Sequence, residues 1–155
     1  MGPTFTTIHL ATHGVLDNRQ PLHSLLLLTK TQGDPENDGL LEAREIMEMN
    51  LQADLAVLSA CETANGRISL GEGVMGMSWA FFVAGTRSML VGQWKINSSS
   101  KYKLMVNFYK ELGSQRTPKT NKASALREVS MRLLKDLRYR HPFYWARFVL
   151  VGNAN

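Results

Sequence analysis

Two side chains in this 155-residue chain, the imidazole of His13 and the thiol of Cys61, are of the types that nucleophilic catalysis uses. A cysteine thiol is mostly protonated at pH 7. A neighbouring imidazole can take its proton and later protonate a leaving amine. Gly14 follows the histidine directly, and its small size lets the backbone approach a substrate carbonyl. The backbone N–H groups of Gly14 and Cys61 would then form a two-donor oxyanion hole.

Both residues follow segments that are typical of β-strands. Thr4–Thr12 is rich in Thr, Ile and Phe, and Ala53–Ala60 contains an uninterrupted apolar run, as in a strand buried on both faces of a parallel sheet. In open α/β sheets the ligand crevice lies outside the carboxyl ends of the strands, and neighbouring strands are about 5 Å apart. We therefore predict that His13 and Cys61 meet in one cleft if their strands are neighbours.

Structural roles are the alternative for both side chains, because a lone cysteine is more often a small buried hydrophobe than a nucleophile. A metal site is a further alternative, since His9 lies four residues before His13. On a strand that spacing is about 13 Å, too long for one metal ion to bridge, so we predict no metal and no cofactor. A single cysteine excludes an internal disulfide and favours a reducing, cytoplasmic setting.

The remaining elements alternate between strand and helix patterns, which predicts one α/β domain over residues 1–155 with a parallel-type sheet. The expected strands are 25–29, 88–92 and 147–151, and the expected helices are 42–49, 74–84, 101–112 and 122–139. Helix 74–84 is apolar nearly all round and is predicted to be buried on every side. Met49 and Leu137 are each expected to point inward from their helices.

Charge is unevenly distributed along the chain, whose net charge is +5. Residues 1–100 carry a net charge of −4 and residues 101–155 a net charge of +9. The spacing predicts that the basic side chains of helix 122–139 face solvent, and we expect no specific nucleic-acid binding. We find neither a signal peptide nor an apolar run of membrane-spanning length, so no membrane partner is expected.

Five motifs then occur in order: ATHG at 11–14, LSACET at 58–63, GEGV at 71–74, QW at 93–94 and FYWARF at 143–148. Together they resemble the CHAT domain, a caspase-like family of clan CD cysteine peptidases. The resemblance implies a caspase-like α/β fold with a mostly parallel sheet flanked by helices. It also implies a Cys/His dyad of Cys61 and His13 that hydrolyses peptide bonds. Such domains commonly follow tetratricopeptide repeats, so repeats in the same full-length protein are an expected partner.

The resemblance has one departure, because such domains normally have further strands before the histidine strand. Here that strand begins within about ten residues of Met1. We therefore expect the chain to be the C-terminal part of a longer domain whose sheet lacks its first strands. An unpaired strand edge of that kind could pair with another chain, so self-association through it is expected.

Specificity rests on two positions by the same resemblance. Related peptidases place a pocket-lining side chain two residues before the nucleophile, and the matching residue here is the small, neutral Ser59. Trp94 follows a predicted strand and could form a wall of the pocket or pack in the core. The expected substrate is a protein or peptide. The alternative is a catalytically inactive caspase-like scaffold or protein-interaction domain. A third hypothesis is a thiol-dependent acyl transferase or hydrolase on a similar sheet, but this sequence contains neither a Ser-His-Asp order nor a glycine-framed serine elbow to support that class.

Overall fold

The main sheet, sheet A, has four strands in the order β1 (Thr7–Leu10), β5 (Leu55–Leu58), β6 (Ser88–Gly92) and β7 (Phe148–Gly152). The computed structural model describes residues 6–33, 37–59, 72–113 and 121–155. Strands β1, β5 and β6 run parallel, and β7 pairs with β6 in the antiparallel direction. The predicted α/β class with a mostly parallel sheet is confirmed.

Strand β5 lies in the middle of the sheet because its sequence is apolar on both faces. All four residues are buried, and they pair with β1 on one side and β6 on the other. A strand covered on both faces does not alternate between apolar and polar residues. The uninterrupted apolar run that predicted this strand has that cause.

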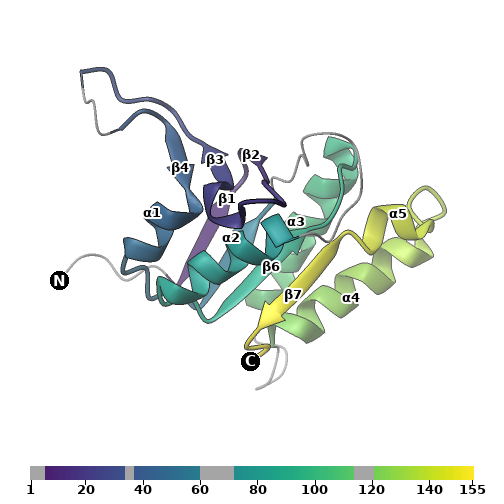
Figure 1. Cartoon of the computed structure of the whole chain (residues 1–155). Helices are drawn as coiled ribbons and strands as arrows, with labels where there is room; N and C mark the ends of the chain where they lie inside the picture. Colours follow the sequence, from purple (N-terminus) through teal and green to yellow (C-terminus); the bar gives the residue numbers. More distant parts are fainter. Residues whose placement is uncertain (1–5, 34–36, 60–71, 114–120) are drawn as a thin grey trace.

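Helices cover both faces of sheet A (Figure 1). On one face, α1 (Ala43–Glu48) and α2 (Glu72–Val83) contribute Ile46, Met77 and Phe81 to a buried cluster. On the other face, α3 (Ser98–Gly113) and α4 (Lys122–Lys135) contribute Phe108, Val129 and other side chains. The sheet is therefore the middle layer of three.

A second, three-stranded antiparallel sheet consists of β2 (His13–Val15), β3 (Leu25–Leu27) and β4 (Leu40–Glu42). The 3-10 turn η1 (Pro21–His23) connects its first two strands. The hairpin that joins β3 to β4 projects away from the body of the molecule (Figure 1). Strand β4 was not predicted, because three residues are too few to show an alternating pattern.

Helix α2 is not buried on every side, so that prediction is wrong. Met75 and Trp79 are 68% and 60% exposed, whereas Phe81 is 2% exposed. The helix lies on one face of the sheet, so only the side of the helix turned toward the sheet is enclosed. Its outer apolar side chains remain on the surface.

Two inward assignments at helix ends are also wrong. Met49 follows α1 in an extended conformation and is exposed. Leu137 is 81% exposed because α4 ends at Lys135. The carboxylate of Asp136 accepts a hydrogen bond from the Arg138 backbone N–H, and such local bonds compete with helix continuation.

The outward position of the basic residues is confirmed for four of the five in 122–139. It is wrong for Lys122, which begins α4 and is 3% exposed, because its Nζ pairs with Asp54 and donates to a backbone carbonyl after β7. Arg127, Arg132, Lys135 and Arg138 are all exposed. Three of them form ion pairs at the surface: Arg127 with Glu128, Arg132 with Glu111, and Arg138 with Asp136. Within the part of the chain that the structure describes, the helices are too short or too polar to cross a bilayer.

Candidate active site

The carboxyl ends of β1, β5 and β6 lie along one edge of sheet A, which we call the carboxyl edge. Leu10 of β1 pairs with Leu58 of β5, and Leu58 pairs with Val91 of β6. The histidine strand and the cysteine strand are therefore parallel neighbours, which meets the condition for a shared cleft of His13 and Cys61. The ladder continues one residue further, because the Ser59 N–H donates to the Leu10 carbonyl at 3.1 Å.

His13 is an exposed residue at the start of β2, three positions after the end of β1. It lies opposite Leu27 of β3, whose carbonyl accepts a hydrogen bond from the Thr12 hydroxyl. Gly14 is buried and lies opposite Leu26. The small antiparallel sheet thus fixes the backbone direction of both residues as the chain leaves β1.

Cys61 lies outside the described residues, as do Ala60 and Glu62. Its assignment as nucleophile therefore stays a prediction, and so does the oxyanion hole formed with Gly14. The described neighbour that comes nearest to it in sequence is Ser59, two positions earlier.

Ser59 is buried, and each of its polar groups has a partner. Its hydroxyl is hydrogen-bonded to His9 Nε2 at 3.2 Å, and its carbonyl accepts from Arg147 Nη2 at 3.0 Å. Its side chain is thus turned toward His9. The pocket-lining role predicted for Ser59 stays a prediction.

His9 was considered only as a metal ligand, and its contacts at the carboxyl edge were not foreseen. Its Nδ1 is hydrogen-bonded to the hydroxyl of Tyr109 on α3 at 3.0 Å, and its Nε2 to Ser59. Partial burial lowers the pKa of His9 below its usual 6.5, and the charge of Lys101 lowers it further. Burial raises the pKa of Tyr109. Both shifts favour the neutral form of the ring, and a neutral imidazole and a phenol can share a hydrogen bond.

Trp94 lies two residues beyond β6, at the same edge, and is half-buried. Its indole N–H donates to the Phe143 carbonyl at 2.8 Å, and its ring stacks on the Phe143 ring at 6.3 Å between centroids. Phe143 belongs to the short helix α5 (Pro142–Trp145). The hydrogen bond and the stacked ring hold Trp94 in one orientation.

Arg147 was missed as a residue of this edge, because an arginine in front of an apolar strand was taken as part of that strand. Its side chain is 3% exposed, and its guanidinium lies against Ser59 and over the Phe148 ring. Its contacts with Ser59 and Phe148 distinguish it from a solvated arginine, and the sequence pattern does not indicate such contacts.

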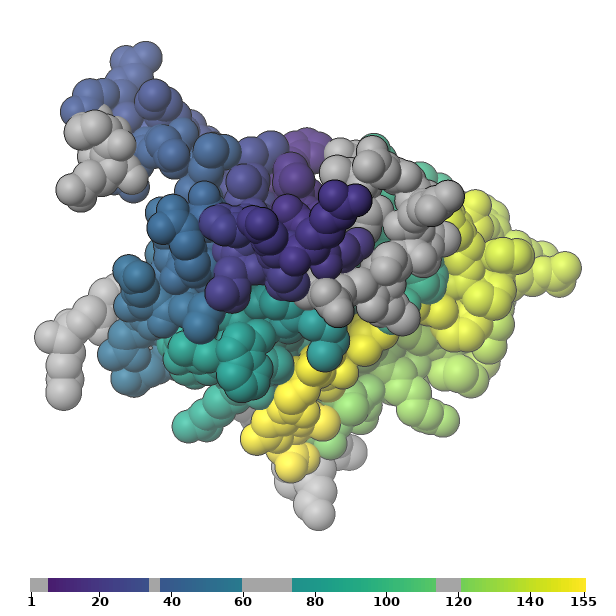
Figure 2. Space-filling model, in the orientation of Figure 1, coloured from purple at the N-terminus to yellow at the C-terminus, as the bar shows by residue number. Residues whose placement is uncertain are grey.

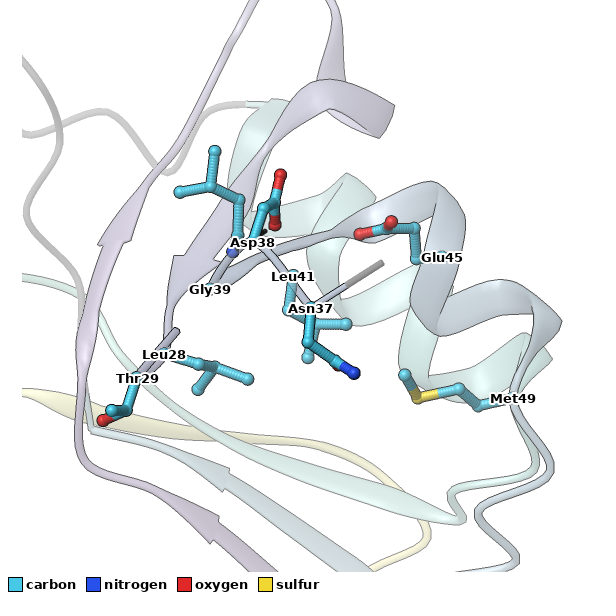
Figure 3. Close-up of a pocket in the computed structure, with 9 residues that line it drawn as sticks. Leu28, Thr29, Asn37, Asp38, Gly39, Leu41, Glu45 and Met49 are labelled. Carbon is cyan, nitrogen blue, oxygen red and sulfur yellow. Dashed lines mark hydrogen bonds between the residues drawn. The ribbon is translucent and has the colours of Figure 1, made fainter. Parts of the chain in front are cut away.

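Two hollows lie elsewhere on the molecule, and neither contains a predicted site residue. One, of about 230 Å³, lies between the β3–β4 hairpin and α1; Glu45 of the helix and Met49, which follows it, are among its lining residues (Figure 3). The other, also of about 230 Å³, is an apolar groove where α2 lies beside β7 on the surface (Figure 2); Met75, Trp79, Val149 and Val151 are among its walls.

A comparison with protein families tests the resemblance that the five motifs suggested. The family model described as the CHAT domain matches residues 1–153. The chain belongs to the CHAT domain family. This caspase-like family accounts for the mixed α/β architecture and supports a peptidase-like domain.

Two curated relatives carry the name tetratricopeptide repeat protein 28. The mouse protein is 30% identical over 120 residues and the human protein 28% identical over 120 residues. Each match covers 77% of this chain but only 5% of the relative. The CHAT domain described here therefore corresponds to a small part of each relative's length.

Proposed function

We propose that this CHAT domain is a cysteine endopeptidase domain in which Cys61 is the nucleophile and His13 the general base and acid. The observation that carries the proposal is the parallel register of β1 and β5, with Leu10 opposite Leu58. His13 and Cys61 each follow those paired residues by three positions in the sequence. Equal offsets from a paired position on adjacent parallel strands support a shared cleft at the carboxyl edge.

The proposed reaction begins when His13 takes the thiol proton and the Cys61 sulfur attacks the scissile carbonyl carbon. The carbonyl oxygen gains negative charge, which the N–H groups of Gly14 and Cys61 stabilise. The intermediate collapses when the C–N bond breaks and the His13 imidazolium protonates the leaving amine. Water, deprotonated by His13, then hydrolyses the thioester and restores the thiol.

Ser59 and Trp94 are the proposed determinants of substrate preference. Trp94 is held by a hydrogen bond and a stacked ring, which supports its role as a fixed apolar wall. Ser59 has a small, neutral side chain, so it offers no fixed charge to select a charged residue of the substrate. We expect the domain to accept protein segments with uncharged side chains at the cleavage site.

The test is cleavage of a fluorogenic peptide library by the purified domain and by its Cys61→Ala variant. We expect the variant to lose all cleavage, while its circular dichroism spectrum stays that of the wild type, because the change removes a single atom. A peptidyl chloromethylketone should label only the wild type. Cleavage by the Cys61→Ala variant contradicts the assignment. Absence of both cleavage and labelling in the wild type supports the alternative, an inactive scaffold.

Partners follow from the relatives and from the edge of the sheet. The relatives' name supports tetratricopeptide repeats elsewhere in the full-length protein as a partner of this domain.

Among the described residues, β1 pairs on one side only, with β5. We propose that its other side takes a further strand, from the same protein or a second copy. Light scattering that shows only monomer at all concentrations contradicts self-association.

A further inference from the structure

We infer that Arg147 is a positioning residue that anchors the carboxyl end of β5, where the chain leads to Cys61. The inference rests on the proposed function, because Cys61 is the nucleophile only in that proposal. It adds to it a residue that neither the motif spacing nor the strand register identifies.

The path of the Arg147 side chain is the first observation. Arg147 lies next to β7, and Ser59 follows β5, so the side chain must cross β6, the strand between them. It crosses at Gly92, where an added Cβ would lie 2.7 Å from both Nε and Nη2 of the guanidinium. Real side chains do not approach that closely, so only glycine leaves the path open. The backbone of Arg147 is fixed as well, because its carbonyl accepts from the Gln93 N–H at 2.9 Å.

The second observation is how completely Ser59 is held. The Ser59 carbonyl accepts a hydrogen bond from Arg147 Nη2 at 3.0 Å. The Ser59 N–H donates to the Leu10 carbonyl, and the Ser59 hydroxyl is hydrogen-bonded to His9. The first bond comes from across β6, and the other two come from residues of β1. A charged donor makes the first of them stronger than a neutral hydrogen bond.

The consequence for catalysis is geometric. A nucleophile must be held close to its productive position, and a misplacement of about 1 Å lowers the rate about 10²-fold. Ser59 is two positions before Cys61, so freedom gained at Ser59 is passed on along the chain. We expect the loss of the anchor to lower kcat and to leave KM nearly unchanged, because Arg147 is buried and does not reach the substrate.

The experiment compares four variants of the domain by hydrogen exchange and by peptide cleavage. Arg147→Leu removes the donors, and Arg147→Lys keeps the charge with one donor group. Gly92→Ala keeps the arginine but blocks its path across β6. Arg140→Leu is the matched control, since Arg140 is exposed. Exchange in α4 reports whether each variant is folded.

We expect Arg147→Leu and Gly92→Ala to exchange at least tenfold faster at the Ser59 amide, with α4 unchanged, and to lose about 10²-fold in kcat. Arg147→Lys should recover part of both, and Arg140→Leu should match the wild type. Wild-type exchange and kcat in Arg147→Leu and Gly92→Ala overturn the inference. So does a higher KM at unchanged kcat. A wild type that never cleaves defeats the proposed function, and exchange at Ser59 then decides the anchor alone.

Discussion

Two buried cations lie at opposite edges of sheet A, and they bind different segments of the chain. Arg147 lies at the carboxyl edge, and Lys122, also 3% exposed, lies at the opposite, amino edge. Lys122 Nζ pairs with Asp54 at 3.2 Å and donates to the carbonyls of Asn153 and Asn155. Both cations thus bind backbone carbonyls at the end of a strand.

The difference lies in which chain segments they join. Lys122 ties the residues after β7 to the start of β5 and of α4, and its backbone N–H donates to the Ala154 carbonyl at 3.0 Å. None of the predicted site residues lies among its contacts. Arg147 instead holds the residue that leads to Cys61. A similar buried contact therefore stabilises the fold at one edge and fixes geometry at the other, which mutations at the two edges should separate.

The largest effect is expected at the carboxyl edge. His13→Ala should lower kcat by about 10²–10⁴-fold if His13 is the general acid and base. The unfolding midpoint should stay near that of the wild type, because His13 is exposed. Peptide cleavage and urea unfolding measure the two quantities on the same sample. Unchanged kcat would show that the imidazole takes no part in the reaction.

At the amino edge we expect the reverse. Lys122→Met should lower the free energy of unfolding by about 2 kcal/mol, because it leaves backbone carbonyls without their donor. The value is below that of a fully buried pair because the Asp54 side chain is 46% exposed. The activity per folded molecule should not change. Lys135→Met, at an exposed position of the same helix, is the control and should fall within about 0.5 kcal/mol of the wild type. A lower kcat in Lys122→Met would erase the contrast between the edges.

Two glycines sharpen the comparison. Gly152 at the amino edge has φ +95°, and a Cβ there would lie 2.6 Å from the Arg87 carbonyl oxygen. Gly152→Ala should therefore lower the free energy of unfolding by about 1–2 kcal/mol, through backbone strain. Gly92→Ala should act mainly on kcat. Urea unfolding and cleavage assays on both variants test this, and equal losses of stability without loss of kcat would contradict it.

The smallest effect concerns acid. Hydrogen bonds from Arg138 lower the pKa of Asp136 from 3.8 to about 2. An acid with a depressed pKa contributes stability above its unfolded value, and this contribution is lost as the pH falls from about 4 toward 2. Asp136→Asn should remove that part of the pH dependence, and Arg138→Leu should shrink it, because the folded-state pKa of Asp136 then rises toward its unfolded value. Urea midpoints at pH 4, 3 and 2 measure it; identical slopes in all three proteins would contradict the assignment.

Sequence predicted the parts of this fold that depend on composition along a single element. The apolar run at 55–58 fixes β5 as a central strand, and the stripe through Phe108 fixes the inner side of α3. The neighbouring positions of β1 and β5 did not follow from that pattern, because the order of strands in a sheet depends on pairing between distant segments.

The parts that sequence did not predict depend on contacts between elements. Trp79 and Phe81 are both large aromatic residues of α2, and the placement of the helix on one side of the sheet exposes the first and buries the second. Leu137 continues the helical spacing, but a local bond at Asp136 ends the helix first. The Arg147 anchor requires Gly92 on one strand and Ser59 after another, and no periodicity links residues so far apart.

The strand pairing of sheet A also affects the stage of folding at which the proposed catalytic site is complete. Leu10 pairs with Leu58, 48 positions later, and Leu90 pairs with Leu150, 60 positions later. The second sheet, by contrast, is built from neighbouring segments, such as Gly14 with Leu26. Contacts between distant segments close slowly, since the entropy of a long loop is lost before the contact forms. The small sheet can therefore assemble early and present His13, while the edge that holds Ser59 is completed only when β1, β5, β6 and β7 have all paired. In a nascent or partly folded chain, His13 and Cys61 of the proposed dyad are therefore not yet brought together.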